Sequence, residues 1–229
     1  MIPNKAFLLL VISMLLLLAV TGCSKTNGPK QSAAAALSPE QIQELRKEYP
    51  LATGYPALIE MRDFSFKELL GVADSVIVAE VIQQMPNFTV NLITDPETPE
   101  GKLAEKQREL GIELYTPVFS SFQVKVDRVV TGKKVEDTVN LFYNFSELKG
   151  IEPELKAGMK IVAAIKQGVG KEQEGGYSYT RYGLYYVVEG DYVLTAFEGQ
   201  SDEMKSFTQR TNGKSLDNLI AEIKSLKGE

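Results

Sequence analysis

The sequence predicts a mainly β domain: a small β-barrel of five to six strands, with short helices before it and an amphipathic helix after it. Two observations support this. Short apolar or alternating segments typical of strands follow one another between about residues 75 and 197, and helical periodicity is concentrated towards the two ends of that region. Strands that are not separated by regular helices favour a barrel over a βαβ sheet.

Two short helices are expected before the strands. The first spans residues 39–48, with Ser38 as its N-cap, proline at its first position and Gln41 three residues after the cap. The second spans residues 65–72 and begins with the capping-box sequence Ser-Phe-Lys-Glu. Both start where a polar side chain can accept a hydrogen bond from a free backbone N–H.

The first strand, Ser75 to Gln83, is apolar on both faces, as in a strand buried from two sides. The other expected strands are 122–127, 138–145, 159–166, 184–188 and 192–197, the last two forming a hairpin. The chain closes with a helix from Ser215, whose apolar residues recur at helical spacing.

The N-terminus predicts a bacterial lipoprotein signal peptide over residues 1–22. Lys5 precedes an apolar run from Ala6 to Val20, and Val20-Thr-Gly leads directly into Cys23, the only cysteine. A transmembrane anchor is the alternative, but this run rises only ~22 Å as a helix, short of the ~30 Å hydrocarbon core. Ordinary secretion with a chance cysteine is a second alternative. We expect Cys23 to be lipidated.

The expected domain organisation has three parts. Residues 1–22 are removed, residues 23–37 carry the lipidated Cys23 and a flexible tether, and residues 38–229 form a single domain. As a flexible coil the tether would span ~20 Å. Because one acyl chain binds a membrane only weakly, stable anchoring of the domain requires the two or more chains of a diacylglyceryl lipid.

Composition excludes several classes of function. The formal net charge of −5 argues against nucleic acid as a partner. There is no histidine, so the commonest general base and zinc ligand is missing. The lipidated Cys23 leaves no cysteine for a disulfide. We therefore expect no metal, no cofactor and no catalytic residue.

A series of segments carries a resemblance. A short helix precedes Ala73-Asp-Ser-Val-Ile-Val-Ala-Glu-Val, and a strand from Phe122 to Val130 ends in a Gly-Lys turn. Asp137-Thr-Val-Asn-Leu, Leu155-Lys-Ala-Gly-Met-Lys-Ile-Val-Ala and a Gly-Leu-Tyr-Tyr-Val-Val hairpin follow.

Over about residues 64–198 this order resembles a group of uncharacterised secreted or lipid-anchored bacterial proteins, most often Gram-positive. More remotely it resembles the OB-type barrel of netrin modules and tissue inhibitors of metalloproteinases. The resemblance implies an OB-like barrel. In those inhibitors an N-terminal cysteine chelates zinc, a mechanism that does not carry over to a lipidated Cys23.

Two segments suggest local chemistry, and each has a simpler explanation. Residues 146–149 have the Ser-x-x-Lys spacing of penicillin-interacting enzymes, without the companion Ser-Asp-Asn and Lys-Thr-Gly motifs. Glu80 is charged within an otherwise apolar strand, which favours a position at a strand edge or facing water.

Two long connections are the candidate binding elements. Residues 86–117 include an expected helix over 100–110, and residues 168–182 are rich in glycine. In an OB barrel they would be the first-to-second and fourth-to-fifth strand loops, which bind ligands. The second carries the candidate binding surface, Tyr177, Tyr179, Arg181 and Tyr182, which we expect to be accessible together. The alternative is that both loops are solvated and the tyrosines lie flat on the barrel.

These observations favour a monomeric, non-catalytic lipoprotein that binds an envelope protein or a small ligand. The alternative is a cell-wall or peptide-processing enzyme using serine or carboxylates. The expected location is the outer face of the plasma membrane in a Gram-positive host, or the outer membrane in a Gram-negative one.

Replacing the lipidation site tests the anchor. In the Cys23→Ala variant we expect an uncleaved or soluble product, because no thiol remains to be acylated. Detergent-phase partitioning of the expressed protein measures this. A processed variant that still partitions into detergent would contradict the lipid anchor.

Overall fold

The computed structural model describes residues 36–53, 65–91, 95–199 and 201–229. The expected signal peptide, Cys23 and nearly all of the tether lie outside the described residues. Residues 34–229 form one compact unit. In the described part of that unit, no helix is both long enough and apolar enough to cross a membrane.

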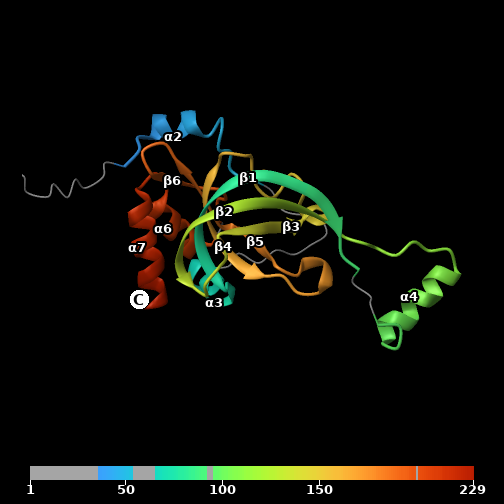
Figure 1. Ribbon diagram of the computed structural model, residues 1–229. Coiled ribbons are helices and arrows are strands. Elements are labelled where there is room, and N and C mark those ends of the chain that lie inside the picture. Colours follow the sequence, from blue (N-terminus) through green and yellow to red (C-terminus); the bar gives the residue numbers. More distant parts are fainter. Residues whose placement is uncertain (1–35, 54–64, 92–94, 200) are drawn as a thin grey trace, which may run out of the picture. The chain divides into compact units, whose positions relative to one another are not determined.

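The described part of the domain is mainly β, as predicted, and the six strands within it form one sheet (Figure 1). The strands are β1 (Ser75–Thr89), β2 (Val118–Gly132), β3 (Thr138–Asn144), β4 (Lys160–Gln167), β5 (Gly176–Val188) and β6 (Tyr192–Thr195). Five of them close into a ring in the order β1-β2-β3-β5-β4, and β6 pairs with β5. All pairs are antiparallel except β3 and β5.

The parallel pairing of β3 with β5 closes the ring. It joins Asn140 to Gly176, Leu141 to Tyr177 and Phe142 to Ser178. A Cβ atom at Gly176 would lie 2.9 Å from the Phe142 ring, closer than Cβ atoms normally approach other atoms. Only glycine therefore lets β5 lie this close to β3 at that point.

The first apolar core fills the ring. Each of the five strands contributes side chains with no accessible surface, among them Ile77, Val124, Leu141, Ile161 and Leu184. Successive residues of a strand face opposite sides, so the alternate positions of these strands point outward. This core explains the alternation that predicted the strands.

The second core lies outside the ring, between helices and the strands β1, β4 and β5. It is covered by α3 (Phe66–Val72), α6 (Asp202–Thr211) and α7 (Leu216–Lys227), of which α6 and α7 lie side by side (Figure 1). Phe66 stacks on Phe207 with ring centroids 4.2 Å apart. Because both cores use β1, its residues Ser75 to Ala79 are buried on both faces. The prediction of two buried faces as far as Gln83 is wrong for the end of that segment, where Ile82 and Gln83 are exposed.

The first two helices begin where the sequence predicts. The side chain of Ser38 accepts from the Gln41 backbone at the start of α2 (Pro39–Leu45), and Ser65 caps α3 in the same way. Leu37 donates its N–H to the Gly213 carbonyl at 2.8 Å. Leu37, placed in the tether by the sequence, is thus attached to the domain.

Arg46 fastens this N-terminal segment to the rest of the domain. Its Nη1 donates to the carbonyls of Thr195, at 2.8 Å, and Tyr49, at 3.1 Å. Its Nη2 donates to Oδ1 of Asn212 at 3.2 Å. One guanidinium therefore holds together the end of α2, β6 and the end of α6.

Three expectations need correction. β1 continues past Gln83 to Thr89, and β5 begins at Gly176, so half of the expected 168–182 loop is strand. The glycines of this segment are typical of a loop. They are part of a strand here because the start of β5 is held by its pairing with β3. The helix α6 was not expected. The other short helices are α4 (Pro99–Glu109), α5 (Phe145–Leu148) and the 3₁₀ turn η1 (Lys171–Gln173).

One edge of β1 is free. β4 pairs only with Ser75 to Glu80, whereas β2 pairs along β1 to Thr89. On the side of β1 away from β2, no described strand pairs with its residues 82–89. This stretch contains Pro86 and an irregularity in register between Met85 and Phe88.

Truncating the stacked ring tests the second core. Phe66→Ala should lower the free energy of unfolding by about 3–5 kcal/mol, since it removes a buried ring and leaves a cavity. Val72→Ala is the matched control, because Val72 lies on the same helix and is 53% exposed. Urea unfolding of the full chain in detergent, followed by circular dichroism, measures both. Equal effects would contradict the packing of α3.

Candidate functional site

The predicted binding surface on β5 is not accessible. Tyr179 and Tyr182 are each 4% exposed and Arg181 is fully buried, while Tyr177 is half-buried. Tyr177 and Tyr179 do share a side, as their alternation predicts, but that side faces the interior of the ring. The expectation of four side chains exposed together is therefore wrong, because this stretch is a ring strand.

Arg181 is the largest fully buried side chain among the described residues. Its guanidinium lies over two rings, with Cζ 4.2 Å from the centroid of Phe197 and 5.4 Å from that of Tyr182. Nη1 also donates to the Ile151 carbonyl at 3.4 Å. The rings and the carbonyl stabilise a cation that has lost its water.

Glu152 is a buried carboxylate beside this cation. It is 4% exposed, and its Oε2 has no hydrogen-bond partner among the described residues. Burial raises the pKa of Glu152 to about 7, while the charge and backbone N–H of Arg181 act to lower it. A pKa displaced this far is typical of functional sites and also of structural ion pairs.

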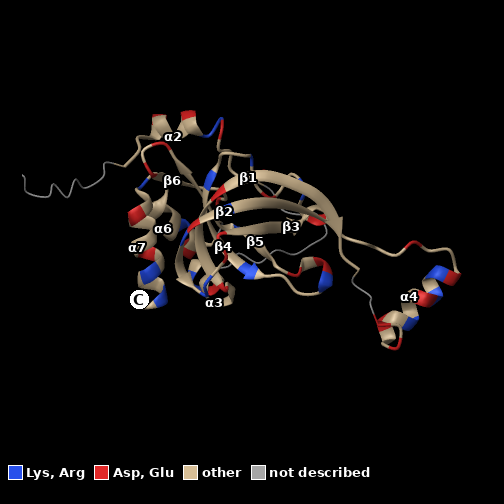
Figure 2. Ribbon diagram, viewed as in Figure 1, with Lys and Arg blue, Asp and Glu red and all other residues tan. Residues whose placement is uncertain are grey.

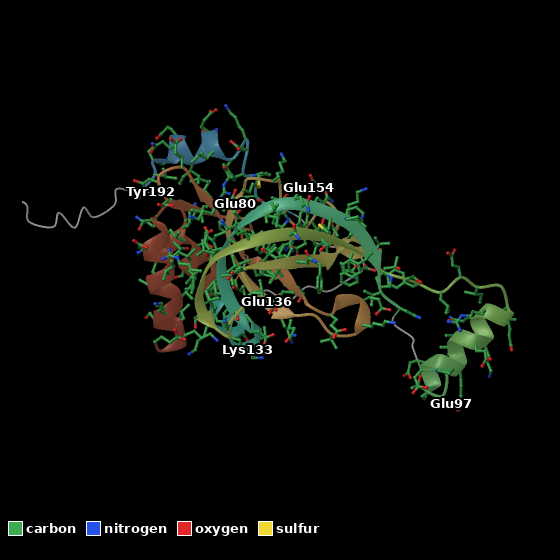
Figure 3. The ribbon with its side chains drawn as sticks, viewed as in Figure 1. Glu80, Glu97, Lys133, Glu136, Glu154 and Tyr192 are labelled. Atoms are coloured by element: carbon green, nitrogen blue, oxygen red, sulfur yellow. The ribbon has the colours of Figure 1, made fainter. Side chains whose placement is uncertain are left out.

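Glu152 lines a hollow of about 200 Å³. Residues 50–53 and the connection before β4 line it. The connection includes the exposed Glu154, which is labelled in Figure 3. The buried hydroxyl of Tyr179 has no hydrogen-bond partner among the described residues, and burial, with Glu152 nearby, raises its pKa well above the usual value. These groups form a polar cluster in an otherwise apolar interior.

The two other residues considered for chemistry have structural explanations. Glu80 is exposed on β1, as expected (Figure 3). The hydroxyl of Ser146 accepts a hydrogen bond from the Val118 N–H at 2.8 Å, which holds α5 against the start of β2. The Lys149 ammonium lies 5.2 Å from the Phe145 ring centroid.

A cluster of phenylalanines lies on the outer face of the ring. Phe88 stacks on Phe119 at 5.4 Å between centroids, and both meet Phe142 edge to face, at 5.7 Å and 5.8 Å. Phe142 follows the interior-facing Leu141 in β3, so it points outward. Phe88 and Phe119 are half-buried. Apolar rings that remain partly open to water are suited to contact a ligand.

A second hollow, of about 180 Å³, adjoins this cluster and is called the aromatic hollow below. It is lined by the end of β1, by β2, by β3 and by the connection between β4 and β5: Met85, Pro86, Phe88, Ser121, Asn140, Phe142, Glu172, Gln173, Glu174 and Gly176. Pro86 and Phe88, which the sequence placed in the first-to-second strand connection, are strand residues of β1, and they line this hollow together with residues 172–174 of the β4–β5 connection.

The chemistry of the aromatic hollow is mixed. Phe88 and Phe142 supply aromatic surface, Asn140 and Gln173 supply amides, and Glu172 and Glu174 supply carboxylates. Within the described part of the chain, no group of three or more His, Cys, Asp or Glu residues could hold a metal ion. The arrangement suits recognition of a side chain by packing and hydrogen bonds.

Sequence reasoning missed these three phenylalanines. Phe88 lies beyond Pro86, where a strand is not expected to continue. The available indication is Phe142, an apolar residue on the opposite side of its strand from Leu141 and Tyr143. An apolar residue that points out of a small ring needs packing partners on the outer face. Phe88 and Phe119 are those partners for Phe142.

Comparison with known proteins gives no relative from which a role could be transferred: no family model matches the chain, and no curated protein shows significant similarity to it.

The raised pKa of Glu152 predicts how stability depends on pH. The pKa of the carboxyl is 4.5 in its ordinary state and about 7 in the folded protein, so the folded state holds the proton more tightly than the unfolded state. The stability of the fold therefore falls as pH rises from 4.5 to about 7. Glu152→Gln imitates the protonated form. It should raise the free energy of unfolding by about 1–3 kcal/mol at pH 8 and change it little near pH 4.5.

Melting temperatures of the full chain in detergent between pH 4.5 and 8.5 measure this. Glu154→Gln is the control, since it removes an exposed carboxylate at the same hollow. A Glu152→Gln protein that is less stable than the wild type at pH 8 would instead indicate that an ionised Glu152 balances Arg181.

Proposed function

We propose that this protein is a non-catalytic binding module of the bacterial cell envelope, and that its binding site is the aromatic hollow. The observation that carries the proposal is the half-buried pair Phe88 and Phe119 beside a hollow with amides and carboxylates. Rings presented in this way give a large contact area with few rotatable bonds, and residues of that kind dominate binding energy.

The topology supports a finer description of the fold, an OB-like barrel. The strand order of the ring and the parallel β3–β5 pair are compatible with that architecture. OB-type barrels bind ligands on the face of their second and third strands, between the first-to-second and fourth-to-fifth loops. The aromatic hollow is lined by β2, β3, the end of β1 and the β4–β5 connection. The netrin-like resemblance belongs to the same proposal.

The lipid anchor is part of the proposal, and the sequence alone supports it. Val20-Thr-Gly-Cys23 supports a lipid at Cys23 and a location on the outer face of the plasma membrane, in a Gram-positive host by the family resemblance. The chain would act as a monomer, with an envelope protein or a small ligand as its partner. The acidic net charge makes nucleic acid an unsuitable partner.

An enzyme is the second candidate, and one observation favours it. Glu152 combines burial, a pKa of about 7 and a position in the wall of a hollow, which are properties of a general acid or base. Catalysis also requires a reacting partner group. The hydroxyl of Ser146 accepts from the Val118 N–H and so has a structural role, which leaves the enzyme hypothesis dependent on Glu152 and not on the Ser-x-x-Lys segment.

A binding panel tests the proposal. Full-length protein in detergent is immobilised and exposed to fluorescent peptides and oligosaccharides, and the probes are recovered for mass spectrometry. We expect one probe class to bind and to be recovered unchanged. Phe88→Ser with Phe119→Ser should weaken this binding about tenfold or more, because the apolar contact area is lost.

The matched control is Val72→Ser, a serine substitution of an exposed apolar residue on α3, which should bind like the wild type. Binding that persists without Phe88 and Phe119, or a panel in which no probe binds, would overturn the proposal. Cleaved probes, with cleavage abolished by Glu152→Gln, would instead support the enzyme.

A further inference from the structure

We propose that the aromatic hollow takes a primary ammonium group on an aliphatic stem, as in the side chain of a lysine carried by a peptide. This inference rests on the proposed function, since it names the ligand chemistry of the same site. It is carried by the size of the hollow, the arrangement of its rings and the sign of the charges that line it.

The size of the hollow suits one long side chain. Its volume of about 180 Å³ far exceeds the ~30 Å³ share of a water molecule. It is also below the ~300–1,000 Å³ typical of pockets that enclose whole small molecules. A side chain projecting from a larger ligand fits between these limits.

The walls suit an aliphatic stem. The rings of Phe88 and Phe142 stand at 89° to each other, with Met85 and Pro86 beside them in the lining. Methylene groups pack favourably on such surfaces, and the long stems of lysine and arginine commonly lie along them. A short polar side chain would leave these walls exposed to water.

The charges at the hollow are negative. Glu172 and Glu174 line it and are exposed, and no lysine or arginine is among its lining residues. Figure 2 shows acidic and basic residues on the connection between β4 and β5, which contains Lys171 outside the lining as well as Glu172 and Glu174 within it. A cation bound there would be stabilised by the two carboxylates and by the faces of the phenylalanine rings.

The amides complete the recognition of a peptide. Asn140 and Gln173 line the hollow. Asn140 can donate to a carbonyl and accept from an N–H, whereas Oε1 of Gln173 accepts from the Val169 N–H at 3.2 Å, which leaves its amide nitrogen to donate. These groups suit the backbone that carries the lysine, so a peptide fits this lining better than an isolated amine. The charge and the apolar walls together set specificity for an ammonium on a stem.

The experiment compares three fluorescein-labelled pentapeptides with glycines around one central residue: lysine, Nε-acetyl-lysine or norleucine. Fluorescence anisotropy with the full chain in detergent measures each Kd. We expect the lysine peptide to bind at least tenfold more tightly than the other two, since acetylation and norleucine keep a stem but remove the charge. The advantage should shrink as salt is raised.

Substitutions in the lining test which side chains cause the preference for the lysine peptide. Glu172→Gln with Glu174→Gln should weaken the lysine peptide to the level of the acetylated one. Glu203→Gln, an exposed carboxylate on α6, should change nothing. Phe88→Ser should weaken all three peptides, because it removes a wall that the stem contacts.

The outcomes separate this inference from the proposed function. Equal binding of the three peptides, lost in Phe88→Ser, would overturn the ammonium preference and leave the binding site in place. Full lysine binding in the Glu172→Gln, Glu174→Gln protein would overturn it as well. If none of the three peptides binds, the ammonium ligand is wrong, and the wider probe panel decides separately whether the hollow binds anything.

Discussion

The closure of the ring by β3 and β5 is the constraint on which the other features of this domain depend. The two strands are distant in the sequence and share a short parallel contact, from Asn140 with Gly176 to Phe142 with Ser178. Such a contact contributes few hydrogen bonds. It is stabilised by what it encloses, since an open sheet would expose the apolar side chains of the interior core to water.

The same closure places both clusters of functional interest. On the inner side it buries Tyr179, whose strand continues into Arg181 and so brings a cation beside Glu152. On the outer side it brings Gly176 against Phe142, which holds the connection after β4 close to the three phenylalanines. Gly168, at the other end of this connection, also lies against Phe142, where a Cβ atom would be 2.8 Å from the ring.

Local interactions made much of the fold predictable. The capping boxes at Ser38 and Ser65 depend on residues three positions apart, and the alternation in β2 and β3 depends on each strand alone. The start of β5 was not predictable in this way, because its partner β3 lies far back in the chain. The site was predictable only in outline. The segments 86–117 and 168–182, expected to carry the binding elements, supply part of its lining, whereas the rings of Phe88, Phe119 and Phe142 meet only after folding.

The free edge of β1 has a consequence for how copies of this domain meet. An unpaired strand edge is a template on which a neighbour's strand can add. Here the edge carries Pro86, which has no N–H to donate, and the nearby irregularity in register disturbs the spacing of the remaining groups. A second chain would find an interrupted ladder at this edge, so the interruption itself protects the domain from sheet-to-sheet assembly.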